Sequence, residues 1–278
     1  MARRWRSSSW WSAAPEGVAS AAAETRRIAL LLEYDGTAYR GSQYQEDGPT
    51  IQSELEGALN KLTGDTVRVA FAGRTDAGVH ALGQVAAFDT RARLGAAEFV
   101  GGLNHFLPRD IAVRSAVEAD ARFDPRRAAR GRLYRYWIDT RPVRSPLWRD
   151  RAWHVPRRLD VEAMRRAGKR LEGAHDFAAF AAPYGGTSAR TLRRCEVVAE
   201  GPCVRVEMEA QAFLPHQVRR TVGPLVEVGS GRMGEDALVR LLEEARPSSA
   251  GPAAPACGLY LVSIAYDGLA FGAGEGDG

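Results

Sequence analysis

Cysteine is scarce in this sequence of 278 residues, which contains only Cys195, Cys203 and Cys257. The number is odd and no two cysteines have the Cys-x-x-Cys spacing. This pattern argues against a disulfide framework and against a structural zinc site. We expect free thiols that pack as small hydrophobic side chains.

Long apolar runs are also absent, since no stretch approaches the roughly eighteen consecutive apolar residues of a membrane-spanning helix. The first eleven residues are basic and then rich in Ser and Trp, without the continuous apolar segment of a secretory signal. These absences predict a cytoplasmic protein that has no membrane partner.

Lysine is nearly missing, because Lys61 and Lys169 are the only two and the other thirty-six cations are arginines. The formal net charge is +4 and the isoelectric point is about 9.1. Arginine suits phosphate binding and stacking on bases better than lysine does. The composition therefore permits a nucleic-acid partner without requiring one.

The two ends of the chain differ in composition from the middle. Residues 1–26 are small, polar or basic without sustained periodicity, and we expect a disordered extension there. Residues 268–278 are expected to form a flexible tail. Its last seven residues, GAGEGDG, look superficially like a dinucleotide-binding glycine loop, but no helix follows them.

Between these ends, strand-length apolar runs alternate with segments that have apolar residues at helical spacing. Strands are expected over 28–34, 67–71, 84–89, 111–117, 133–139, 192–199, 204–212 and 259–265. Helices are expected over 51–62, 96–106, 161–171, 217–228 and 235–244. This mixture, with a hairpin across Gly201-Pro202, predicts an α+β fold. We expect two similar halves, residues 27–117 and 118–267.

Residues 73–81 are the most unusual segment, with the sequence GRTDAGVHA between two expected strands. Its glycines allow close approach of the backbone and positive φ angles. An acid beside an arginine stays ionised, as a nucleophile must. The same residues also suit a surface turn in which Arg74 pairs with Asp76. The residues alone leave both interpretations open.

The nonapeptide resembles the catalytic motif of the tRNA pseudouridine synthases known as the TruA family. Other segments resemble the family in order and spacing from about residue 28 to 266. They are 33–36 (EYDG), 104–113, 122–123, 132–136 (RLYRY), 175–177 (HDF), 190–191, 213–223 and 258–261 (GLYL).

By this resemblance, the chain isomerises uridine to pseudouridine at positions 38, 39 or 40 in the anticodon arm of tRNA. It works without a cofactor or metal, as a homodimer, with an arginine-lined active-site cleft between the halves of each chain. Two alternatives remain: a synthase of the same fold that acts on another RNA, and a non-catalytic RNA-binding protein. A metal-dependent RNA hydrolase is a weaker alternative, because no dense cluster of carboxylates or histidines is present.

The resemblance implies three catalytic residues: Asp76 as the nucleophile, Arg219 as its ion-pair partner, and Tyr134, which stacks on the uracil. Whether Asp76 attacks C1′ or C6, or acts through a glycal, stays open. Without the resemblance, Arg219 could be a surface arginine and Tyr134 a core aromatic. Tyr136 has the same side-chain parity as Tyr134, so alternation alone does not choose between them.

Four further residues are expected to bind substrate. Arg74 resembles the arginine that enters the space left by the flipped-out nucleotide, and Gln43 and Arg190 belong to matching segments. His80 could equally order the loop through a hydrogen bond. The chain departs from the family at Ser42, where tryptophan is usual, so a large surface for packing or RNA contact is missing there. Gln217 stands at a usual methionine.

Overall fold

The computed structural model describes residues 24–271, and the elements below belong to that part of the chain. The expected extension over 1–23 and the glycine-rich heptapeptide over 272–278 lie outside the described residues. Arg26 begins the first strand, one residue before the expected boundary of the N-terminal half.

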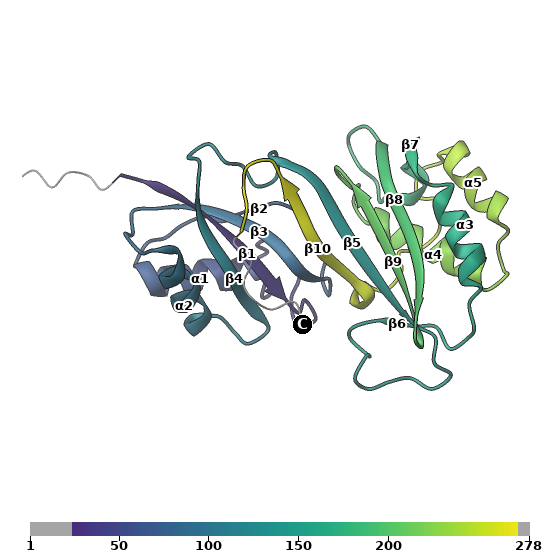
Figure 1. Cartoon of the computed structure of the whole chain (residues 1–278), viewed down its shortest axis with the longest axis horizontal. Helices are drawn as coiled ribbons and strands as arrows, with labels where there is room; N and C mark the ends of the chain where they lie inside the picture. The colour runs from purple at the N-terminus through teal and green to yellow at the C-terminus, as the bar shows by residue number, and fades with distance from the viewer. Residues whose placement is uncertain (1–23, 272–278) are drawn as a thin grey trace, which may run out of the picture.

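Ten strands of the described part form one sheet, in the order β4-β1-β3-β10-β5-β9-β8-β7, with β2 beside β3 and β6 beside β5 (Figure 1). Helices lie beside both ends of this sheet, so the expected α+β class is confirmed. The strands are β1 (Arg26–Tyr34), β2 (Ala70–Phe71), β3 (His80–Thr90), β4 (Ile111–Ala119), β5 (Ala129–Asp139), β6 (Trp153–His154), β7 (Gly173–Asp176), β8 (Ala189–Glu200), β9 (Cys203–Ala210) and β10 (Leu259–Tyr266).

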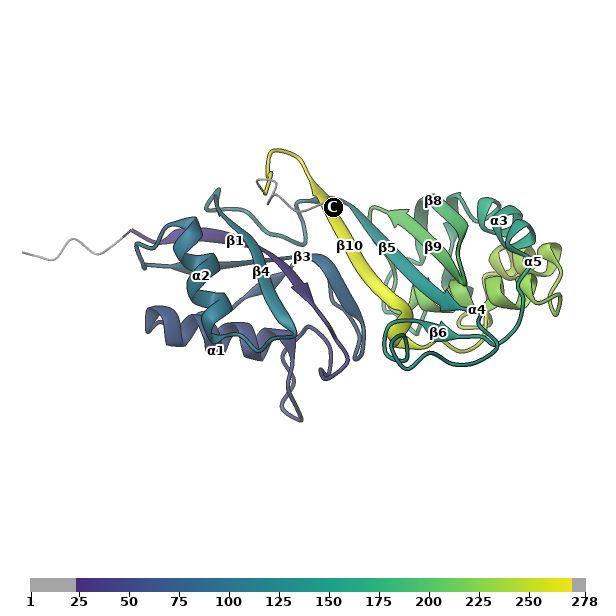
Figure 2. The same ribbon diagram turned by 60° about the horizontal axis from the view of Figure 1, so that its bottom comes forward.

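The last strand of the described part, β10, lies in the middle of the sheet and pairs with strands from both sides. β10 pairs antiparallel with β5 along most of its length. On its other side it pairs parallel with β3 through Tyr260 opposite His80 and Leu261 opposite Ala81. Figure 2 shows β10, in yellow, between the strands of the N-terminal part and those of the C-terminal part.

Five helices of the described part fall into two groups (Figure 2). None of them has the length and apolar character needed to cross a membrane. Helix α1 begins after the N-cap Thr50 and α3 after the N-cap Asp160, whose side chains accept backbone N–H groups. Near β1 and β4 lie α1 (Ile51–Thr63) and α2 (Ala96–Phe106), and near β7 to β9 lie α3 (Val161–Lys169), α4 (Gln217–Gly229) and α5 (Glu235–Glu244).

Two predicted strand bounds around the nonapeptide are wrong. The strand expected over 67–71 is reduced to β2, because the Val69 N–H donates to the Glu56 carboxylate of α1 at 3.0 Å and joins no ladder. The strand expected over 84–89 begins earlier, at His80, because its first residues pair with β10. Such a partner, distant in sequence, leaves no local pattern. The loop between β2 and β3 therefore covers residues 72–79. It is shorter than the loop between the two predicted strands.

Candidate active site

A buried polar network of Gln84, Tyr34 and Thr75 holds the loop over residues 72–79 in place. The Gln84 side chain donates to the Gly73 carbonyl at 2.8 Å and accepts the Gly73 N–H at 3.3 Å. The Tyr34 and Thr75 hydroxyl oxygens are 2.8 Å apart, and burial raises the pKa of Tyr34 to about 12. Since both Gln84 and Tyr34 are almost completely buried, this network fixes the backbone just before Asp76.

Ser42 holds the same loop through two hydrogen bonds to Thr75. Its buried hydroxyl accepts the Thr75 N–H at 2.9 Å, and its own N–H donates to the Thr75 carbonyl at 3.1 Å. Gly41 precedes it at a φ of 102°, and a Cβ there would lie 2.7 Å from the Thr75 oxygen. The departure at Ser42 therefore gives a direct hydrogen bond to the loop that carries Asp76.

Asp76 faces the first turn of α4 from this loop. Arg219 Nη1 donates to Asp76 Oδ2 at 2.8 Å, while Arg219 Nε donates to the Ala254 carbonyl at 2.7 Å. The guanidinium is thus fixed at two points and orients the carboxylate. The Asp76 side chain remains 36% exposed, so one side of it is open to a ligand.

His216 is a neighbour of Asp76 that the sequence did not single out. Its Nε2 lies 3.6 Å from Asp76 Oδ2. It is the N-cap residue of α4 and has a φ of 61°, a region that non-glycine residues seldom adopt. Such backbone strain often occurs at functional sites, but it has no signature in a single sequence.

Tyr134 lies in β5, with its ring perpendicular to that of Phe213 at a centroid distance of 5.2 Å. The side chain is nearly buried, and this burial raises the pKa of its phenol above the ordinary value. The phenol is therefore protonated at neutral pH, with its aromatic face available for stacking. Tyr136, on the same face, instead donates to the Pro255 carbonyl at 2.7 Å and is fully buried.

A cavity of about 510 Å³ brings these groups together. Five of the expected site residues line it: Arg74, Asp76, Tyr134, Arg190 and Arg219. Arg126, Arg132, Phe213 and His216 also line it, although the sequence analysis gave them no role. The side-chain parity of Arg132 with Tyr134 was the one signal that could have identified it. The residues that line the cavity come from both expected halves of the chain, 27–117 and 118–267.

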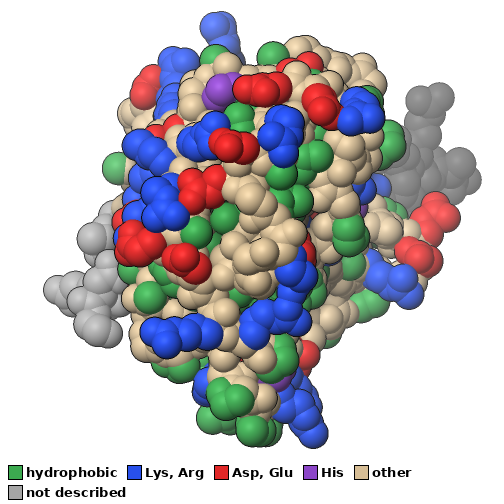
Figure 3. Space-filling model, turned by 90° about the vertical axis from the view of Figure 1, so that its right-hand side faces the viewer, with side chains coloured by type: hydrophobic (Ala, Val, Ile, Leu, Met, Phe, Trp, Pro, Cys, Tyr) green, Lys and Arg blue, Asp and Glu red, His purple; other side chains and the backbone are tan. Residues whose placement is uncertain are grey.

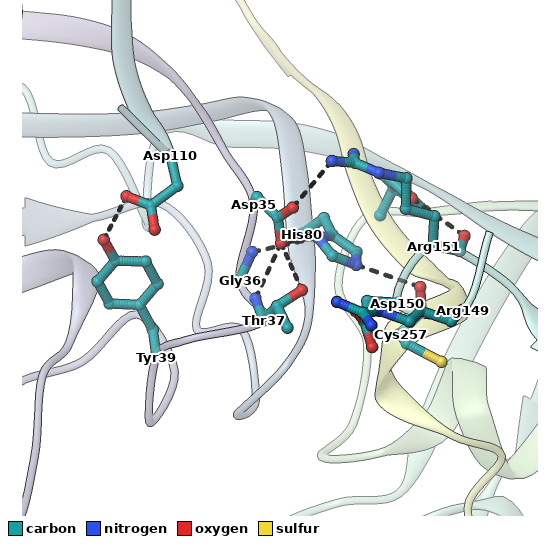
Figure 4. Close-up of polar contacts among 11 residues, drawn as sticks. Asp35, Gly36, Thr37, Tyr39, His80, Asp110, Arg149, Asp150, Arg151 and Cys257 are labelled. Carbon is teal, nitrogen blue, oxygen red and sulfur yellow. Dashed lines mark hydrogen bonds and ion pairs between the residues drawn. The ribbon is translucent and has the colours of Figure 1, made fainter. Parts of the chain in front are cut away.

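His80 and Gln43 do not line this cavity. Gln43 is exposed, whereas His80 is buried in a separate polar cluster that Figure 4 shows. There the His80 Nδ1 accepts the Gly36 N–H at 3.1 Å, and the Nε2 lies 3.2 Å from the Cys257 carbonyl oxygen. His80 follows the loop directly, so this placement supports the loop-ordering role among the two that the sequence left open.

Metal ligands are not gathered anywhere in residues 24–271, where no three His, Cys, Asp or Glu side chains are placed to hold an ion. The cysteines are free in this part of the chain. In the β8–β9 ladder, Cys195 lies opposite Met208 and Cys203 opposite Glu200. The site is thus built from one carboxylate, arginines and aromatic rings.

Comparison with known proteins identifies the family of this chain. A family model described as tRNA pseudouridine synthase matches residues 31–126 and 167–267. A tRNA pseudouridine synthase A from Myxococcus xanthus is 48% identical over 243 residues, covering 86% of this chain and 92% of the relative. One from Pelobacter propionicus is 46% identical over 244 residues, covering 87% and 100%. The chain therefore belongs to the tRNA pseudouridine synthase family, whose members isomerise uridine to pseudouridine in tRNA.

Proposed function

We propose that this chain converts uridines at positions 38, 39 or 40 of the tRNA anticodon arm to pseudouridine, with Asp76 as the nucleophile. The observation that carries this proposal is the ion pair of Asp76 with Arg219 at 2.8 Å, at a cavity shared with Tyr134. A carboxylate held in one orientation beside an aromatic ring suits attack on a nucleotide that stacks on that ring.

The target nucleotide has to leave its helical stack to reach Asp76, at a cost of roughly a few kcal/mol. Arg74 precedes Asp76 by two residues, lines the cavity and is exposed. A guanidinium in this place can fill the gap in the RNA by stacking and hydrogen bonding. Arg190, on β8, lines the opposite, C-terminal part of the cavity and is suited to an RNA phosphate.

The assembly that we propose is a homodimer in the cytoplasm. Support for it comes from the family resemblance, and sedimentation of the purified chain tests the dimer. The exposed Gln43, outside the cavity, would then contact RNA beyond the flipped nucleotide.

The proposal is tested with tRNA transcripts that carry tritium at C5 of uridine. Isomerisation releases this tritium to water, and the modified position is then mapped. Asp76→Asn keeps the shape of the side chain but removes its negative charge, so we expect no tritium release and retained tRNA binding.

The matched control is Asp236→Asn, an aspartate on α5 that is exposed and pairs with Arg170. It should release tritium at the wild-type rate. Substantial turnover by Asp76→Asn would remove Asp76 from its role. If the chain modifies uridines outside the anticodon arm, or only in another RNA, the proposed isomerisation stands and the proposed tRNA substrate is wrong.

A further inference from the structure

Arg132 is a buried arginine in the wall of the active-site cavity. It lies on β5, two residues before Tyr134 and on the same face of the strand. The residue is only 8% exposed, the same as Tyr134. Side chains of Arg132 and Tyr134 therefore reach the cavity from adjacent positions of one rigid strand.

Backbone carbonyl groups hold this guanidinium in place. Nη1 donates to the Gln211 carbonyl at 2.6 Å, and Nη2 donates to the carbonyls of Ala72 and Arg126 at 2.8 and 3.1 Å. These partners come from both halves of the chain and fix the plane of the guanidinium. Ala72 is also the first residue of the loop that carries Asp76, so the positions of Arg132 and Asp76 are linked.

Within residues 24–271, Arg132 forms no ion pair with a carboxylate. The neighbouring Arg135 differs, because its side chain on the other face pairs with Glu207 at 2.8 Å. In the cavity wall the single carboxylate, Asp76, is already paired with Arg219. Burial lowers the pKa of Arg132, which reflects the cost of a buried charge without a counterion.

This uncompensated charge lies in the wall of the cavity in which the proposed reaction creates a negative charge. When the C1′–N1 bond breaks, its electron pair stays on uracil, which becomes an anion delocalised over the ring nitrogens and carbonyl oxygens. We propose that Arg132 is a further catalytic residue, which stabilises the negative charge on the departing uracil. This inference rests on the function proposed above.

The steps balance without another reactant. In the route where Asp76 attacks C1′, its carboxylate oxygen bonds to C1′ as N1 leaves with the electron pair. The uracil turns, C5 bonds to C1′ with a pair from the ring, and the carboxylate leaves with its own pair. The C5 proton then passes to water and N1 takes up a proton. Arg132 acts while the uracil carries the charge, and a fixed cation there needs no reorganisation.

The test compares two leaving groups. Fluorine at C5 withdraws electrons and stabilises the uracil anion without help from the protein. Wild type, Arg132→Gln and Arg132→Lys are each mixed in excess with anticodon-arm RNA that carries uridine or 5-fluorouridine at the target position. Digestion to nucleosides and chromatography then follow the loss of the starting nucleoside under single-turnover conditions.

Loss of Arg132 should slow the reaction of uridine by roughly a hundredfold, as for removal of one donor to a developing charge. With 5-fluorouridine the slowdown should be several-fold smaller. Arg132→Lys keeps the charge but not the planar fork, so we expect a smaller effect of the same sign. Either variant suffices if the other does not fold.

Arg130→Gln is the matched control, because this arginine lies on the same strand but is exposed and outside the cavity. It should leave both rates unchanged. An equal slowdown on both RNAs in the Arg132 variants would mean a merely structural role and would overturn the inference. Should wild type alter neither RNA, the proposed function itself would fail.

Discussion

At the residue scale, His80 is held by partners from the segment after β1 and from β10 and the residues just before it. Nδ1 accepts the Gly36 N–H and also lies 3.1 Å from Asp35 Oδ1, while Nε2 meets the Cys257 carbonyl (Figure 4). The ring stacks on Tyr260 of β10 at a centroid distance of 4.6 Å. These contacts fit a neutral imidazole that carries its proton on Nε2.

This arrangement predicts acid sensitivity. Burial lowers the pKa of His80 below its ordinary value, and the opposing attraction of Asp35 is smaller. Below about pH 6.5 the unfolded chain therefore binds more protons than the folded one, so the free energy of unfolding falls as the pH falls. His80→Asn should flatten this decline, which is at most about 1.4 kcal/mol per pH unit for one proton.

Urea unfolding at intervals between pH 7.5 and 5.5 measures the effect. The pKa of Asp35 is lowered, so this carboxylate titrates at more acidic pH. His105→Asn, an exposed histidine near the end of α2, serves as the control and should keep the wild-type slope. If His80→Asn keeps it too, the buried imidazole is not the source of the acid sensitivity.

The sequence identified the residues with distinctive local chemistry. The resemblance of GRTDAGVHA to the family motif predicted Asp76, and the family pattern predicted Arg219, which the structure places 2.8 Å from Asp76; their catalytic roles stay predictions. Arg132 and His216 were missed for different physical reasons. Arg132 is one of thirty-six arginines, and its parity with Tyr134 was a weak signal beside its burial, which only the structure reveals. His216 depends on a positive φ that the sequence does not reveal.

At the scale of elements, β10 should contribute to the stability of both halves. Leu261 is fully buried on this strand, opposite Tyr134 of β5 on one side and Ala81 of β3 on the other. Leu261→Ala should lower the free energy of unfolding by about 2–5 kcal/mol, because it removes transfer free energy and leaves a cavity. The urea midpoint measures the loss, and tritium release shows whether the active site loosens with it.

Val262→Ala is the control on the same strand, since Val262 is only partly buried. If Val262→Ala lowers the free energy of unfolding as much as Leu261→Ala does, the buried contact of Leu261 with both halves is not the source of the stability. Helix bounds were predicted more closely than strand bounds, because caps such as Thr50 and Asp160 are local signals. The β3–β10 pairing joins residues far apart in sequence and had no such signal.

At the scale of the whole molecule, positive charge is concentrated where RNA is proposed to bind. The cavity wall contains five arginines, Arg74, Arg126, Arg132, Arg190 and Arg219, against one carboxylate, Asp76. On the face around α3 and α5, basic and acidic side chains lie beside one another (Figure 3). Examples are the ion pairs Arg166–Glu235 and Arg170–Asp236. Net charge there is nearly compensated.

Binding of tRNA should therefore fall steeply as salt rises, because each neutralised phosphate releases counterions. Arg74→Gln should weaken binding and reduce the slope of log affinity against log salt by about one unit if Arg74 contacts a phosphate. Arg170→Gln, on the compensated face, should leave the slope unchanged. Filter binding over a range of salt concentrations measures both, and a flat response in wild type would contradict an arginine-lined RNA site.

The position of β10 has a consequence for how the protein is made. Among the described strands β10 is synthesised last, yet it occupies the centre of the sheet. The edges of β3 and β5 that pair with β10 therefore stay unpaired until it is made. Pairings of such long sequence separation form slowly and expose strand edges meanwhile. Truncation before residue 259 would therefore leave β3 and β5 without the strand that both of them pair with, although the two strands stay in one polypeptide.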